Sequence, residues 1–184
     1  MPVAGCFESV TGAGLTKGES LGQTIILMNK PGVPEGYNTL TPSLNLRGAN
    51  DALAFYQKAF NAVERFRMPD ANGGVMHGEF QIGDSIVMFC DEEPAWGAVS
   101  PQAVGGCPLS LNLYVPDCDA LTAQAVAAGA ELLRSPTSYP WGERSAMLCD
   151  PFGFRWAICT HIEDVTPEEI QRRMATWNPE TSEW

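Results

Sequence analysis

The pair His77 and Glu79 is the clearest chemical signal in the sequence, since the two residues stand two positions apart. They fall in the segment 74–82, where polar and apolar residues alternate as in a β-strand, so both side chains project from one face. An imidazole beside a carboxylate can act as a base with its orienting partner, or supply two ligands to Zn, Ni, Mn or Fe. A plain polar contact on a partly exposed strand is the third interpretation, and all three stay open.

An internal repeat indicates which elements must position this pair. Ser43-Leu44-Asn45-Leu46 recurs as Ser110-Leu111-Asn112-Leu113, and Asp51-Ala52-Leu53 recurs as Asp119-Ala120-Leu121. The order of structural signals that follows each match is also the same. We therefore expect two copies of one supersecondary unit.

Each copy is predicted to fold as β-α-β-β-β. The first helix is expected over 50–60, with Asn50 or Asp51 as its N-terminal cap, and the second over 119–128. They are expected to end at Asn61 and Gly129, residues that tolerate a positive φ. The strands are expected at 41–46, 63–68, 74–82 and 85–90, then at 109–115, 131–134, 144–149 and 154–160. A long loop is expected over 135–143. The predicted fold is α+β, with one module at about 38–92 and a second at about 107–162.

The first strand of each copy has one polar and one apolar face. If the apolar faces carry the helices, the polar faces are left to line a cleft. The predicted cleft residues are Thr41, Ser43, Asn45, His77, Glu79, Ser110, Asn112 and Tyr114.

The segment from Trp141 to Arg144 adds a second candidate group. It could close the mouth of the cleft with an aromatic wall and a guanidinium for an acidic ligand. It could equally be a packed indole and a structural ion pair.

Composition excludes several classes of partner. With 11 basic and 22 acidic residues among 184, the net charge is −11, which argues against binding nucleic acid or anionic lipid. The sequence has no apolar run long enough to span a membrane. Its six cysteines lack metal-site or disulfide-framework spacing, so reduced thiols and a cytoplasmic location are expected. Residues 1–36 are expected to be a loosely ordered extension, and 165–184 a helix, opened by a capping box at Thr166, with a tail.

Several short motifs occur in a fixed order along the chain. They are Pro34-Glu35-Gly36-Tyr37, Ala54-Phe55-Tyr56, Met76-His77, Ile82-Gly83-Asp84-Ser85, Leu113-Tyr114-Val115, Asp150-Pro151-Phe152-Gly153 and Thr160-His161-Ile162-Glu163. Together they resemble the vicinal oxygen chelate superfamily, which includes glyoxalase I, extradiol dioxygenases and bleomycin-resistance proteins, and within it the PhnB-like branch.

The resemblance implies curved mixed sheets around a cleft over 37–164, and a homodimer. It places Thr41, Ser110 and Ala157 where metal-dependent members carry ligands, with Val87 or Met88 on the fourth strand. These side chains are poor ligands, so no cofactor is expected, and a divalent metal would have to use His77 and Glu79. Because members of the branch begin near Met28, we also expect residues 1–27 to be an overextended start or an appended leader.

The predicted function is binding of a small organic molecule in the sheet cleft. The alternative is a metal-dependent lyase, isomerase or dioxygenase that uses His77 and Glu79. A non-catalytic dimeric scaffold is the third possibility. If the protein is an enzyme, a glyoxalase-like lyase or a dioxygenase is expected.

Overall fold

A computed structural model describes residues 32–178 of the chain. The elements below all belong to the compact unit Val33–Trp184. The predictions about residues 1–27 lie outside the described residues. No helix within residues 32–178 is long and apolar enough to cross a membrane.

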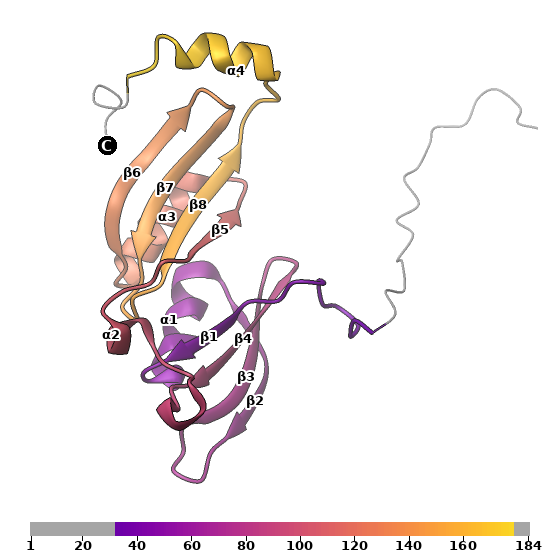
Figure 1. Ribbon diagram of the computed structural model, residues 1–184, viewed down its shortest axis with the longest axis vertical. Helices are drawn as coiled ribbons and strands as arrows, with labels where there is room; N and C mark the ends of the chain where they lie inside the picture. Colours follow the sequence, from indigo (N-terminus) through magenta and orange to yellow (C-terminus); the bar gives the residue numbers. More distant parts are fainter. Residues whose placement is uncertain (1–31, 179–184) are drawn as a thin grey trace, which may run out of the picture. The chain divides into compact units, whose positions relative to one another are not determined.

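Two four-stranded sheets confirm the predicted α+β fold of two β-α-β-β-β modules (Figure 1). In each sheet the first strand lies at an edge and pairs in parallel with the fourth, and the other pairs are antiparallel. The first module comprises β1 (Ser43–Leu46), α1 (Ala49–Phe60), β2 (Val63–Pro69), β3 (Val75–Ile82) and β4 (Ser85–Asp91). The second comprises β5 (Ser110–Tyr114), α3 (Cys118–Ala128), β6 (Glu131–Tyr139), β7 (Glu143–Cys149) and β8 (Arg155–His161).

Within residues 32–178, three further helices lie outside the repeat. The linker between the modules forms the short helices η1 (Pro94–Trp96) and α2 (Pro101–Val104), and α4 (Pro167–Met174) follows β8. The amide of Glu169 donates to the hydroxyl of Thr166, which confirms the predicted N-terminal cap of α4.

The loop predicted over 135–143 is wrong, because β6 continues to Tyr139. Pro136 lies inside this strand, where it cannot donate a ladder hydrogen bond. The pairing with β7 is irregular between Arg134 and Thr137, and this irregularity accommodates the proline.

The predicted cap of α1 is also wrong. Neither Asn50 nor Asp51 caps it, since the N-cap residue is Gly48 and no side chain there bonds the helix. The carboxylate of Asp91, at the end of β4, accepts from the amides of Gly48 and Ala49 instead. A residue distant in sequence thus satisfies the free N–H groups of the helix. The C-terminal ends of α1 and α3 were predicted correctly: Asn61 has a φ of 56° and Gly129 a φ of 116°.

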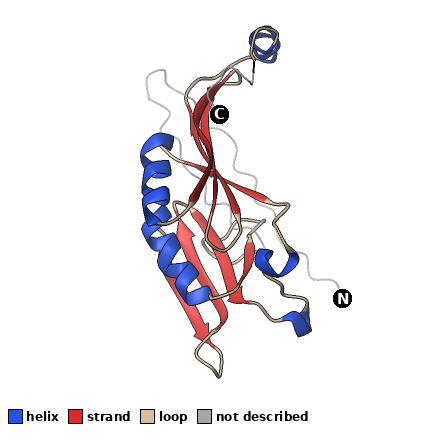
Figure 2. Cartoon of the chain, turned by 90° about the vertical axis from the view of Figure 1, so that its left-hand side faces the viewer, coloured by secondary structure: helices blue, strands red, loops and turns tan. Residues whose placement is uncertain are grey.

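The helices α1 and α3 cover the apolar faces of the sheets, and the polar faces are left open on the other side. Figure 2 shows both helices against one side, with the short linker helices on the opposite side. Alternate residues of the strands enter the core, for example Leu44 and Leu46 on β1 and Trp156 and Ile158 on β8. Burying such side chains contributes about 1.5 to 3 kcal/mol each to folding, so this pattern decides which face is open.

A buried carboxylate joins the two modules. Asp150, at the end of β7, accepts hydrogen bonds from the Tyr56 hydroxyl of α1 at 2.8 Å and from the Trp156 indole at 2.9 Å. The amides of Phe152 and Phe154 donate to its other oxygen. Burial raises the pKa of Asp150, so its ionised form costs stability at neutral pH, a cost that disappears as the pH falls. The four donors offset much of that cost.

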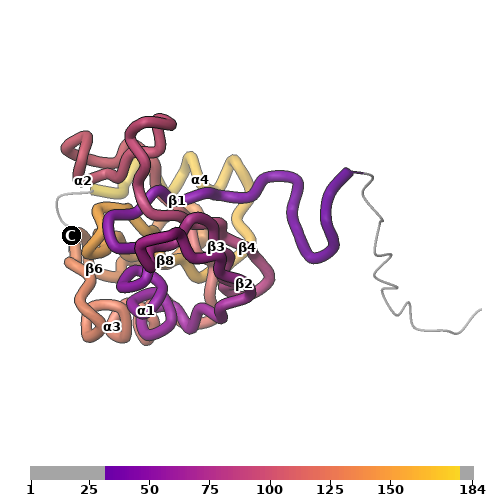
Figure 3. The backbone as a smooth tube through the Cα atoms, turned by 90° about the horizontal axis from the view of Figure 1, so that it is seen from below, coloured from indigo at the N-terminus to yellow at the C-terminus, as the bar shows by residue number. Residues whose placement is uncertain are grey.

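Contacts between α1 and α3 reinforce this joint, and Figure 3 shows the two helices side by side. The side-chain amide of Gln124 on α3 donates to the carbonyls of Lys58 and Ala59 at the end of α1. The rings of Phe60 and Trp156 lie 4.7 Å apart between the modules. These contacts lock the two modules into one arrangement.

Replacing Tyr56 by Phe should destabilise the protein by about 1 to 3 kcal/mol, because the buried Asp150 carboxylate loses a donor that water cannot replace. Urea unfolding followed by circular dichroism measures the change. The control is Tyr114→Phe, which removes an exposed hydroxyl and should cost less than about 0.5 kcal/mol. Equal stability of Tyr56→Phe and the wild type would show that the joint contributes little.

Candidate functional site

The polar face of the first sheet brings together four of the predicted residues. His77 and Glu79 project from β3, with His77 Nε2 3.5 Å from Glu79 Oε1. Ser43 and Asn45 project from β1, and the thiol of Cys90 on β4 donates to the side-chain oxygen Oδ1 of Asn45. The sequence thus identified the pair on one face.

Apolar side chains line the outer part of this face. Phe66 lies opposite Glu79 and Met68 opposite His77 on β2. The rings of Phe66 and His77 are 6.2 Å apart. The pair therefore stands between apolar and polar side chains, half-buried.

Tyr37 joins this group and was not among the predicted site residues. Its hydroxyl donates to Glu79, which raises the pKa of Tyr37. A turn closed by the bond from the Tyr37 amide to the Pro34 carbonyl positions it. The Pro-Glu-Gly-Tyr motif was the available signal. Thr41 lies just before β1, where its hydroxyl donates to the Asn38 carbonyl.

The polar face of the second sheet carries the other predicted strand residues. Ser110, Asn112 and Tyr114 are exposed on β5, and they pair with Arg155, Ala157 and Cys159 on β8. The Tyr114 hydroxyl donates to Glu143, and this bond raises the pKa of Tyr114 to about 12. Tyr114 is therefore neutral at physiological pH.

Trp141 and Arg144, the two candidate residues of the 141–144 segment, do not lie together. Trp141 stacks on Tyr139 at a centroid distance of 4.5 Å, and its indole donates to Glu143. Arg144 points to the helix side of the sheet, where its guanidinium donates to both oxygens of Asp119 on α3 and lowers the pKa of that carboxyl. Arg144 consequently does not share the polar face, and we leave it out of the site proposed below.

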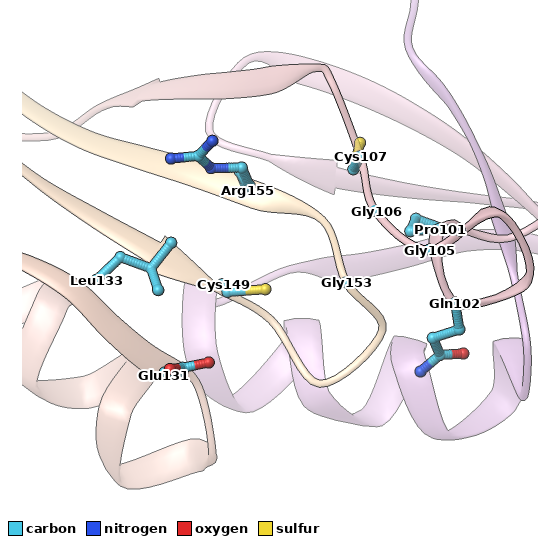
Figure 4. Close-up of a pocket in the computed structure, with 10 residues that line it drawn as sticks. All are labelled: Pro101, Gln102, Gly105, Gly106, Cys107, Glu131, Leu133, Cys149, Gly153 and Arg155. Atoms are coloured by element: carbon cyan, nitrogen blue, oxygen red, sulfur yellow. The ribbon is translucent and has the colours of Figure 1, made fainter.

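A hollow of about 420 Å³ lies at one end of the polar face of the second sheet, next to the linker (Figure 4). Glu131 and Leu133 of β6, Cys149 of β7 and Arg155 of β8 form its floor. The wall comes from α2 and the following residues, with Pro101 and Cys107 among them. This hollow was not predicted from the sequence, although Arg155 shares a strand face with Ala157.

The turn between β7 and β8 holds the wall in place. Gly153 has a φ of 89°, and a Cβ atom there would lie 2.9 Å from Cβ of Pro101, too close for any other residue. The side-chain amide of Gln102 donates to the Pro151 carbonyl at 3.0 Å. The linker helix is thus fastened to the second module.

A second hollow, of about 500 Å³, lies between the end of β6 and α4. Its two arginines, Arg172 and Arg173, both bind Glu169, and Arg173 also binds Glu163. These guanidinium groups are already paired, so this hollow offers less to a ligand.

Comparison with known proteins identifies the family. The sequence model of the Glyoxalase/Bleomycin resistance protein/Dioxygenase superfamily matches residues 41–158. The chain belongs to this superfamily. An uncharacterised protein of Mycobacterium bovis is 34% identical over 140 residues, which cover 74% of this chain and 92% of the relative.

Solved structures show the same fold. TioX from Micromonospora sp. ML1 has a TM-score of 0.56 at 23% identity, covering 68% of this chain and 99% of TioX. A superfamily enzyme from Burkholderia phytofirmans has a TM-score of 0.54 at 24% identity, covering 65% of this chain and 95% of its own. The PhnB protein of Bacillus cereus has a TM-score of 0.53 at 20% identity, with 67% and 99% coverage.

The candidate ligands within residues 32–178 do not make a complete site for a resident metal ion. Among residues 32–178, no three His, Cys, Asp or Glu side chains gather in a way that could hold one. His77 and Glu79 supply two donors, and the nearby Cys90 thiol has its pKa raised, mainly by burial, which disfavours the thiolate that metals bind. The metal-dependent lyase or dioxygenase remains an untested prediction.

Two donors hold a divalent metal weakly, so the untagged protein should retain well under one metal ion per chain. Metal analysis by mass spectrometry after incubation with Mn²⁺, Ni²⁺, Zn²⁺ or Fe²⁺ and desalting measures this. Near-stoichiometric metal that is lost in His77→Ala, and kept in the control His161→Ala, would contradict the expectation and support the enzyme alternative.

Proposed function

We propose that this protein binds a small organic molecule on the polar face of its second sheet, in the hollow between β6, β7, β8 and α2. The observation that carries the proposal is the hollow itself, whose volume of about 420 Å³ falls within the usual range of small-molecule sites. The proposal concerns binding and includes no catalytic step.

The lining of the hollow suits a partly apolar ligand. Leu133 and Pro101 offer hydrocarbon surface. Burial, helped by the charges of Asp150 and Glu131, raises the pKa of Cys149, so this thiol is neutral and weakly nucleophilic at physiological pH. It acts as a small apolar part of the floor. On the same polar face, Ser110 and Asn112 add hydrogen-bonding groups.

Membership of the PhnB-like branch is part of the proposal. The ordered motifs of the sequence support it, from Pro34-Glu35-Gly36-Tyr37 to Asp150-Pro151-Phe152-Gly153. The fold similarity to the Bacillus cereus PhnB protein is consistent with it.

We propose further that the protein acts as a homodimer. Large apolar side chains are exposed on the polar faces, including Phe66 on the first sheet and Tyr114 on the second. The strands β1 and β5 are edge strands, each paired on one side only within its sheet. Exposed apolar patches and open edges are both features that a second copy would cover.

A cytoplasmic location completes the proposal. The five cysteines among residues 32–178 are free thiols. Free thiols persist in a reducing compartment, which supports this location.

Filling the hollow tests the binding site. Ligands found by a thermal-shift screen of small organic molecules should lose at least about tenfold in affinity for Leu133→Trp, since the indole occupies their space. The matched control Val126→Trp places the same ring on the exposed surface of α3 and should bind normally. Ligands that bind Leu133→Trp as tightly as the wild type would contradict this site.

Light scattering coupled to size-exclusion chromatography tests the dimer. The expected mass at micromolar concentration is twice the 19.9 kDa of one chain. Introducing a charge with Phe66→Glu should shift the mass toward one chain, because an ionised carboxylate is costly to bury in an interface. A wild-type mass of one chain at these concentrations would overturn the dimer.

A further inference from the structure

Among the described residues, Arg155 is an arginine without a hydrogen-bond or ion-pair partner, in a chain rich in acidic residues. Within residues 32–178 its guanidinium makes no hydrogen bond or ion pair, whereas Arg47, Arg67 and Arg144 each bind a carboxylate. The side chain stands on β8 at the hollow, as Figure 4 shows. Five N–H donors are thus available to a ligand.

Glu131 provides the opposite charge in the same hollow. It is exposed at the start of β6, and within the described part of the chain its carboxylate has no hydrogen bond or ion pair. Glu131 pairs in register with Cys149, and Cys149 pairs with Arg155. The two charged residues therefore stand two strands apart, about 10 Å between backbones, with a neutral thiol between them.

This spacing leaves both charges available. Within residues 32–178 Arg155 and Glu131 form no ion pair with each other, and the apolar side chains of Leu133 and Pro101 line the same hollow. A ligand with only a negative charge would be repelled by Glu131, and a ligand with only a positive charge would be repelled by Arg155. A molecule that carries both charges satisfies both ends.

Building on the proposed function, we infer that the ligand is a zwitterionic small molecule with an apolar body, its carboxylate bound to Arg155 and its ammonium group to Glu131. An amino acid carries a carboxylate and an ammonium group, and each forms charge-assisted hydrogen bonds of about 2.8 Å with the side chain of opposite charge. The apolar part then lies against Leu133 and the thiol of Cys149.

Four probes with the same phenyl body test the inference by calorimetry: phenylalanine, 3-phenylpropionate, 2-phenylethylamine and the neutral 3-phenylpropanamide. Phenylalanine should bind at least about tenfold more tightly than each of the other three. Arg155→Met should abolish its advantage over phenylethylamine, and Glu131→Gln its advantage over phenylpropionate. The controls Arg172→Met and Glu168→Gln, on α4, should leave the order unchanged.

The outcomes separate this inference from the proposed function. If phenylalanine binds no better than the neutral amide, or if none of the four probes binds, the zwitterion inference is wrong. In that case the proposed function still stands if Leu133→Trp weakens the binding of the screened ligands. If Leu133→Trp leaves every screened ligand bound, the hollow is not the site and both fail.

Discussion

The hydrogen bond between Tyr56 and Asp150 is the contact on which the arrangement of the two modules depends. A carboxylate buried at this depth is costly unless donors surround it, and one of its donors comes from the other module. If the modules rotate, the buried carboxylate therefore loses one of its four donors. The packing of α1 against α3 adds area to the joint, while the carboxylate makes it specific.

The same residue shapes the proposed binding site. Asp150 accepts the amides of Phe152 and Phe154 and so closes the turn in which Gly153 lies. The linker helix α2 rests on that glycine and walls the hollow. One buried acid thus positions both the joint between the modules and the rim of the site, so changes at the joint should also affect the hollow.

Much of the fold could be predicted because its signals are local. Strand alternation, the repeat and the left-handed residues Asn61 and Gly129 depend on near neighbours, and strand parity alone placed His77 and Glu79 on one face. The errors arise from distant contacts. Asp91 caps α1 from the end of β4, and Pro136 is accommodated by an irregular pairing. Arg144, for which the sequence left two interpretations open, binds Asp119 on the helix side. The hollow was missed for the same reason, since its wall is a linker helix without periodicity.

We propose that the ligand site of this superfamily member is the hollow at Arg155 on the second sheet, and not the His77–Glu79 pair on the first. A crystal structure of the full chain with the tightest ligand of the screen tests it most directly. Ligand density is expected among Arg155, Leu133 and Cys149, beneath α2. Density beside His77 and Glu79, with the hollow filled by solvent alone, would contradict it.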